Sequence, residues 1–330
     1  PKPERTASLT DYPQCDAELS RLCDELWGPG VSPAGQRAVG RGRVIWGKTA
    51  REVLAVDGVP PDFSYEVKDG TAVLDYIHRR LDDRDIYFVS NQSESEAYVE
   101  CLFRVAGRQA QFWNPLTGGI ADAPAVAGQR GQTRVPIEFA PYGSVFVVFG
   151  PAAGAGASPK ALPARSRWAE VRQLEGPWTV AFVSPWGETF ETAMATLRNW
   201  AEDRQDARVR YHSGKAVYEH AFEMAADECE GSGIVLDLGR VEDVGIARVY
   251  LNGQDLGVVW TKPFRVAISG AVKPGANHLR VEVINSWRNR LIGDRLLPAD
   301  QRRSATNIAV TEGWTPADSG LLGPVRILRR

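Results

Sequence analysis

The sequence lacks several features that would assign a protein quickly to a class. Its four cysteines, Cys15, Cys23, Cys101 and Cys229, form no Cys-x-x-Cys pair, and none has a histidine at zinc-ligand spacing. We therefore expect ordinary thiols and no bound metal. No segment approaches the roughly 18–20 apolar residues that a membrane-spanning helix needs. The formal charge of −2 gives no reason to expect nucleic acid or an anionic membrane as a partner.

Common catalytic and cofactor motifs are also missing, so we expect no cofactor. There is no phosphate-binding loop, and Gly40–Arg43 is too short for a dinucleotide fingerprint. Calcium is compatible with many β-rich domains, but no Asp-x-Asp-x-Asp-Gly loop is present. The acidic run Asp82–Asp85 has the composition of a solvated turn. The chain starts Pro-Lys-Pro-Glu, without methionine or a signal peptide, and we expect it to be the interior of a longer protein.

What the chain does contain is enough apolar material for two or three domains, with 43% hydrophobic residues among 330. Residues 1–66 read as a short residual α/β segment of an upstream domain. Residues 16–27 carry apolar side chains at helical spacing, and residues 44–46 form a short strand. Thr49 and Glu52 then have the spacing of a capping box that begins a second helix.

Most of the remaining sequence alternates between apolar and polar residues, which indicates strands. Residues 67–150 predict a β-sandwich, residues 151–168 a linker rich in Gly, Ala and Pro, and residues 169–330 a jelly roll. Asn252-Gly253 predicts a two-residue hairpin turn, because both residues tolerate positive φ. The stretch 193–200 predicts one short helix. The predicted fold is therefore mainly β.

Several motifs add a family resemblance. The Leu251-Asn-Gly hairpin followed by Trp260 and Pro263-Phe264 resembles the galactose-binding-like jelly roll of β-galactosidase-like enzymes. The run from Asn285 to Asp294, Asn-Ser-Trp-Arg-Asn-Arg-Leu-Ile-Gly-Asp, resembles the C-terminal region of large bacterial α-L-rhamnosidases. Residues 76–80 and 112–118 are similar to the same family.

This resemblance implies that a whole enzyme would hydrolyse terminal α-L-rhamnose with carboxylates of a (β/α)₈ barrel. The barrel would precede the region matched here, and its carboxylates have no matching positions in this sequence. The resemblance therefore implies no catalytic residue in this chain and no turnover by the isolated chain. Its role would be to brace the missing N-terminal catalytic barrel and to contact carbohydrate. The bacterial relatives favour a periplasmic or extracellular location over a cytoplasmic one.

The best candidate binding residues follow the strand that ends near Asn285, because sites are often built where a strand opens into a loop. Indole rings can stack on sugars, while Arg, Asn and Asp can bond to hydroxyl groups. These groups could equally fix a loop or a domain interface. The candidates are Trp287, Arg288, Asn289, Arg290 and Asp294, with Tyr211, His212 and Trp260 as expected neighbours.

Two further candidates lie in the predicted sandwich. His78 could bond to a sugar or orient a neighbouring domain, although a structural histidine is commoner. Trp113 could form part of a subsite or cap the sandwich. Two rivals to the accessory role remain: a free-standing carbohydrate-binding protein without catalysis, and a small complete hydrolase. The second would need two carboxylates roughly 5–10 Å apart in a cleft.

Overall fold

The N-terminal part of the chain contains the two helices and the short strand that the sequence predicts, and this strand, β2, pairs with β1 in a hairpin. The computed structural model describes residues 2–30, 32–152, 167–231 and 233–330. Glu52 and Thr49 form both bonds of the predicted capping box. None of the helices within these residues is long and apolar enough to cross a membrane. The elements are α1 (Gln14–Trp27), β1 (Gly35–Val39), β2 (Gly42–Trp46) and α2 (Ala50–Val56).

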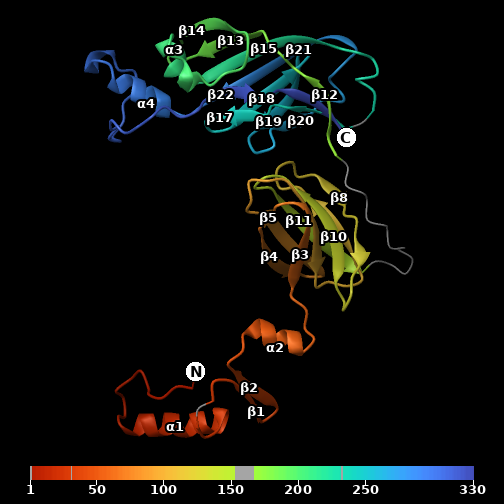
Figure 1. Cartoon of the computed structure of the whole chain (residues 1–330), viewed down its shortest axis with the longest axis vertical. Helices are drawn as coiled ribbons and strands as arrows, with labels where there is room; N and C mark the ends of the chain where they lie inside the picture. Colours follow the sequence, from red (N-terminus) through yellow and green to blue (C-terminus); the bar gives the residue numbers. More distant parts are fainter. Residues whose placement is uncertain (1, 31, 153–166, 232) are drawn as a thin grey trace.

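This N-terminal segment does not build a core of its own. Among its described residues up to position 62, only Cys23 and Gly28 are buried, and α2 buries none of its side chains. Leu9 and Val56 are 85% and 78% exposed. In Figure 1 the segment lies at the end of the molecule farthest from residues 167–330, and α1, β1 and β2 lie apart from the strands that follow.

The first β region, strands β3 to β11, consists of two antiparallel sheets. Their strand orders are β3-β6-β10-β9 and β4-β5-β11-β7-β8. Alternate residues of β5 and β6 point inward, so Tyr87, Val99 and Phe103 are fully buried between the sheets. The strands are β3 (Phe63–Gly70), β4 (Leu74–Leu81), β5 (Arg84–Asn91), β6 (Ala97–Phe103), β7 (Arg108–Trp113), β8 (Ile120–Asp122), β9 (Val126–Ala127), β10 (Thr133–Phe139) and β11 (Ser144–Ala152).

The second β region, strands β12 to β23, contains a six-stranded sheet, a four-stranded sheet and one short strand pair. The strand orders are β14-β13-β15-β21-β18-β19, β12-β23-β16-β20 and β17-β22. The strands are β12 (Ala169–Gln173), β13 (Trp178–Val183), β14 (Thr189–Met194), β15 (Lys215–Met224), β16 (Ile234–Asp237), β17 (Arg240–Glu242), β18 (Ile246–Leu251), β19 (Gln254–Val259), β20 (Arg265–Ala267), β21 (Gly275–Ile284), β22 (Gly320–Gly323) and β23 (Arg326–Arg329).

Short helices connect some of these strands. They are η1 (Trp200–Glu202), α3 (Ala207–Arg210), α4 (Arg288–Arg295) and η2 (Ala299–Gln301). The helix predicted over residues 193–200 is wrong, because β14 pairs with β13 up to Met194 and only the last of these residues enters η1. The predicted hairpin turn is confirmed, with φ of 54° at Asn252 and 82° at Gly253. Most of the predicted linker, residues 153–166, lies outside the described residues.

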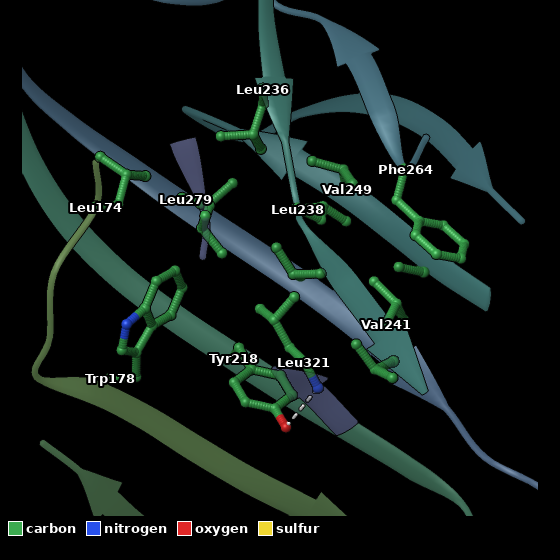
Figure 2. Packing of buried hydrophobic residues seen from close by; sticks show 14 of the residues in the cluster. Leu174, Trp178, Tyr218, Leu236, Leu238, Val241, Val249, Phe264, Leu279 and Leu321 are labelled. Atoms are coloured by element: carbon green, nitrogen blue, oxygen red, sulfur yellow. Dashed lines mark hydrogen bonds between the residues drawn. The ribbon is translucent and has the colours of Figure 1, made fainter. Parts of the chain in front are cut away.

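The core of the second β region surrounds Trp178 and Tyr218 (Figure 2). Tyr218 is fully buried, and its hydroxyl oxygen accepts hydrogen bonds from the Leu321 backbone N–H at 3.1 Å and from Trp200 Nε1 at 2.7 Å. The first of these bonds ties β22 to β15 inside the core. Strand β15, which precedes α4 in the chain, and strand β22, which follows it, therefore belong to the same core.

Candidate functional site

The predicted site residues after Asn285 lie on α4 and at its start. The strand β21 ends at Ile284, α4 follows from Arg288, and a segment without strands leads from Leu296 back to β22. Backbone groups in such a segment need partners other than a sheet. Asparagine and aspartate side chains supply many of them.

Asn285 fixes the chain just before α4, and Asn289 holds the end of the segment that leads back to β22. The Asn285 amide donates to the His212 carbonyl at 2.8 Å and accepts from the Gly214 N–H at 3.0 Å. Asn289, which is 1% exposed, donates to the Ala317 carbonyl at 2.9 Å and accepts from the Ala317 N–H at 2.7 Å. Asn289 was a candidate for carbohydrate binding, but these bonds use its amide to hold the returning chain.

Asp294 has a similar structural role at the C-terminal end of α4. One carboxylate oxygen accepts from the Ser304 N–H at 2.7 Å, the Ser304 hydroxyl at 2.5 Å and the Arg303 N–H at 3.1 Å. The other lies 2.6 Å from Arg290 Nη2. Burial raises the pKa of Asp294, but the bonds from Ser304 and Arg290 outweigh it and lower the pKa below its usual value. The carboxylate therefore stays charged and occupied.

Three tryptophans lie around these anchored residues. Trp287 is 50% exposed and contacts Trp186 edge to face, with ring centres 5.4 Å apart. The Arg290 guanidinium lies 5.4 Å from the centre of the Trp186 ring. Arg288 lies 4.9 Å from the Trp314 ring and donates to the Thr315 carbonyl. We call Trp186, Trp287, Trp314, Arg288 and Arg290 the tryptophan surface.

The structure brings Tyr211 and His212 close to α4, as predicted, but gives them packing roles. The side chain of Tyr211 lies so close to Gly293 that a Cβ there would be 2.7 Å from Tyr211 Cβ. His212 is 6% exposed and packs edge-on against Phe182 and Trp200. Burial lowers the pKa of His212 to about 4, although the Lys215 carbonyl partly opposes this effect. His212 is thus a neutral core residue near pH 7.

Trp260 and Trp113 do not belong to the tryptophan surface. Trp260 directly follows β19 and is 59% exposed, and it lines a cleft between the two β regions. Trp113 ends β7, is partly buried, and donates its indole N–H to Gln111 at 3.3 Å. The sequence predicts Trp260 beside the α4 residues, but the structure places it in this cleft instead.

His78 forms a structural network in the first β region. Its ring nitrogens lie 3.0 Å from Asp62 and 3.1 Å from Asp85, and its ring stacks on Tyr87 at 4.0 Å. The Tyr87 hydroxyl donates to Asp62 at 3.1 Å. Asp85, expected in a solvated turn, is instead buried and also pairs with Arg108 at 3.2 Å. Every polar atom of the imidazole ring therefore already has a carboxylate partner.

Sequence reasoning missed Trp186 and Trp314. Trp186 lies in the turn between β13 and β14, and Trp314 lies in the segment between α4 and β22. Each lies in a loop next to one glycine, and ten tryptophans is a high number for a chain of 330 residues. That signal could have selected them as surface candidates, but only the fold places them beside α4. Within the described ranges, no group of three His, Cys, Asp or Glu residues could hold a metal ion.

Comparisons with known proteins agree with this β-rich arrangement. Residues 1–124 match the family model of glycoside hydrolase family 106, alpha-L-rhamnosidase. The whole chain is similar to 30% of a rhamnosidase from Novosphingobium sp. PP1Y, with 35% identity and a TM-score of 0.81. A Formosa agariphila protein named "Putative beta-glucuronidase" is 34% identical over 179 residues, which is 47% of this chain and 15% of that protein.

The chain thus spans less than a third of the length of either relative. Its full-length similarity to one segment of a rhamnosidase agrees with the family match in its first 124 residues. Residues 1–124 thus match a glycoside hydrolase family 106 alpha-L-rhamnosidase domain, and residues 125–330 lie outside this family match.

Proposed function

We propose that this chain is the accessory β-rich part of an enzyme that cleaves terminal α-L-rhamnose from glycans. In this proposal the first β region is a β-sandwich and the second a galactose-binding-like jelly roll. Together they brace the catalytic barrel of the same polypeptide. The similarity over 100% of this chain but only 30% of the Novosphingobium rhamnosidase supports a division of the whole enzyme into this accessory part and a separate catalytic part.

The observation that carries the proposal is the surface of the N-terminal segment. Among its exposed apolar side chains are Tyr12, Leu54 and Val56, which are 63%, 47% and 78% exposed. Isolated soluble domains seldom leave several such residues exposed on elements without a core, because burying them against another surface is favourable. The catalytic barrel of the same polypeptide would supply that surface.

The tryptophan surface supports a contact with carbohydrate. The indole face of a half-exposed Trp287 can stack on a pyranose ring, while Arg288 and Arg290 offer N–H donors to hydroxyl groups. Trp186 and Trp314 each have an arginine over the ring, which fixes their orientation. In this proposal the surface holds an outer part of the glycan and performs no chemistry.

The same site argues against a small complete hydrolase. Glycoside hydrolysis needs two carboxyl groups roughly 5–10 Å apart beside the glycosidic bond. Asp294 is buried and fully engaged with Ser304, Arg303 and Arg290. A carboxylate in this state cannot approach a glycosidic oxygen. We therefore expect the isolated chain to release no sugar.

A binding experiment tests the bracing role. The chain and the catalytic part of the enzyme are produced separately, mixed, and followed by size-exclusion chromatography and by hydrolysis of an aryl α-L-rhamnoside. We expect a complex with the wild-type chain and at least about tenfold weaker association with the double variant L54E/V56E. Ile120→Glu, at a 58% exposed apolar position in β8, is the matched control. Hydrolysis by the chain alone, or equal complex formation by both variants, would contradict the proposal.

A second experiment tests the tryptophan surface in the whole enzyme. Trp287→Ala should raise KM for a rhamnose-ended oligosaccharide by about three- to tenfold, because it removes one stacking face. The kcat for a small aryl α-L-rhamnoside should not change, because this substrate is too short to reach an outer surface. If KM values for both substrates stay at wild-type levels, the surface does not contact the glycan.

A further inference from the structure

A cleft of about 890 Å³ lies between the two β regions. Its first wall comes from the end of β7 and the turn that follows, and includes Asn114, Leu116 and Thr117. Its second wall comes from β19 and the chain after it, and includes Val258, Trp260 and Lys262. Ligand pockets usually have volumes of about 300–1,000 Å³, mainly apolar walls and a few polar groups, and this cleft has all three properties.

Ion pairs that cross from one β region to the other hold the walls of the cleft together. Arg265 Nη1 lies 3.0 Å from Glu96 Oε1, and Arg330 pairs with Glu138. Both guanidinium groups also lie over the Trp168 ring, 5.6 and 5.3 Å from its centre. We call the Arg265–Glu96 and Arg330–Glu138 pairs the charge clasp.

The charge clasp rests on a buried support. The Arg265 Nε donates to Asp237 at 3.0 Å, and Asp237 is 3% exposed. This contact fixes Arg265 within the second β region. Its partner Glu96 belongs to the first β region, so the Arg265–Glu96 pair joins the two regions. In contrast, Glu96 and Glu138 are partly exposed and can be changed without disturbing a core.

The apolar part of the cleft is open to solvent. Trp260, Leu116 and Val258 are 59%, 55% and 51% exposed, and they come from both walls. An exposed indole between aliphatic side chains can accept the flat apolar face of a sugar ring.

Three polar groups in the cleft, on Asn114, Trp260 and Lys262, are donors without an acceptor among the described residues. Asn114 accepts from the Leu116 and Thr117 N–H groups with its oxygen, but over the described residues its side-chain NH₂ makes no hydrogen bond. Within the described ranges, the Trp260 indole N–H has no hydrogen-bond acceptor and the Lys262 ammonium group has no carboxylate partner. A ligand rich in acceptor oxygens would satisfy all three donors, whereas an apolar peptide segment would leave them unsatisfied.

We propose that this cleft is a second carbohydrate-binding site, distinct from the tryptophan surface. An oligosaccharide lies between the two β regions, with one pyranose ring stacked on Trp260. The Asn114 amide, the Trp260 indole N–H and the Lys262 ammonium group donate to its hydroxyl oxygens. The charge clasp sets the distance between the walls, so binding depends on Glu96 and Glu138 although neither needs to touch the sugar.

Isothermal titration of the 330-residue chain with rutinose (a disaccharide that ends in α-L-rhamnose), cellotetraose and xylotetraose tests the proposal. We expect measurable binding of at least one of them. Trp260→Ala should weaken it by about tenfold or more, and Trp260→Phe by less, because phenylalanine keeps part of the stacking face. The residue is largely exposed, so both variants should keep the wild-type circular dichroism spectrum.

Two controls separate this site from the tryptophan surface. Trp113→Ala removes a tryptophan of the first β region that does not line the cleft, and Trp287→Ala removes the most exposed ring of the tryptophan surface. Trp113→Ala should bind as the wild type does, and Trp287→Ala should keep the part of the binding that Trp260→Ala removes. No binding of any of the three sugars overturns the cleft proposal. A loss caused by Trp287→Ala but not by Trp260→Ala also overturns it, while it would support the tryptophan surface.

The charge clasp has its own test. The double variant E96Q/E138Q keeps the size of both side chains and removes their charge. We expect about three- to tenfold weaker sugar binding at low salt and an unchanged unfolding temperature. Wild-type binding should weaken with added sodium chloride, because salt screens partly exposed ion pairs. Wild-type affinity in the double variant would show that the clasp does not control the cleft.

Discussion

The strongest prediction concerns Asp294, which the sequence presents as a binding residue and the structure presents as an anchor. Its carboxylate is 3% exposed. It accepts from the Ser304 N–H and hydroxyl and from the Arg303 N–H, and it lies 2.6 Å from Arg290 Nη2. We expect Asp294→Ala to detach the segment after α4 and to lower the free energy of unfolding.

The size of this loss follows from the groups left behind. Breaking a buried ion pair by removing one partner costs about 3–5 kcal/mol, because the other charge remains without compensation. The Arg290 side chain is 23% exposed and can turn partly toward water, so we expect the lower end, about 3 kcal/mol. Asp294→Asn keeps one acceptor oxygen for the Ser304 N–H and should lose about 1–2 kcal/mol.

Urea unfolding followed by circular dichroism and by tryptophan fluorescence measures both variants. Glu312→Gln is the matched control, because Glu312 lies in the same segment, pairs with Arg295 at 3.0 Å and is 92% exposed. It should change the free energy of unfolding by less than about 0.5 kcal/mol. If Asp294→Ala is as stable as this control, the carboxylate does not anchor the segment and the reasoning fails.

The same carboxylate should also produce a pH dependence. Its pKa lies below the usual 3.8 in the folded chain, because the bonds from Ser304 and Arg290 outweigh the effect of burial. An unfolded chain therefore takes up this proton first as the pH falls. The stabilisation is complete above the usual pKa and is lost as the pH falls through the folded pKa. Asp294→Asn should flatten the stability curve below about pH 4, and an unchanged curve would contradict this assignment.

Two further predictions concern the core that supports α4. Tyr218→Phe leaves the N–H groups of Trp200 and Leu321 without their acceptor, which should cost about 2–4 kcal/mol in urea unfolding; a loss under about 1 kcal/mol would mean that water replaces the hydroxyl. His212 has its pKa lowered from 6.5 to about 4 by burial, so the unfolded chain gains a proton first and stability should fall as the pH drops between these values. Replacement by Gln should remove this slope in unfolding measured from pH 7 to pH 4, and a slope that persists would assign it to other groups.

Local chemistry explains what could be predicted from the sequence. The turn at Asn252 and the capping box at Thr49 depend on residues next to them, so neighbouring residues were sufficient. The helix expected over residues 193–200 failed for the opposite reason. Its apolar spacing fits a helix, but Met194 pairs with Trp178 in the neighbouring strand, and the sheet decides the conformation.

The candidate site also has parts that the sequence could predict and parts that it could not. The run from Trp287 to Asp294 does form one cluster, as its composition suggests. The sequence could not reveal that Asn289 is 1% exposed, because its partner Ala317 comes from a distant turn of the chain. Nor could it bring Trp186 next to Trp287, since only the folded sheet places the β13–β14 turn beside α4. Contacts across long sequence separations decide which polar residues are free to bind.

The buried amides and carboxylates nevertheless bear on function. A connection between two strands needs no helix fixed by Asn285, Asn289 and Asp294, because a shorter turn exposed to water would satisfy its own backbone groups. Fixing these residues costs conformational entropy before any ligand arrives. That cost is useful if Trp287 must already have the orientation in which a sugar ring stacks on it, because the ligand then loses less affinity to ordering of the protein. The residues that are too buried to touch carbohydrate are therefore the ones that would make the exposed indole rings effective at binding it.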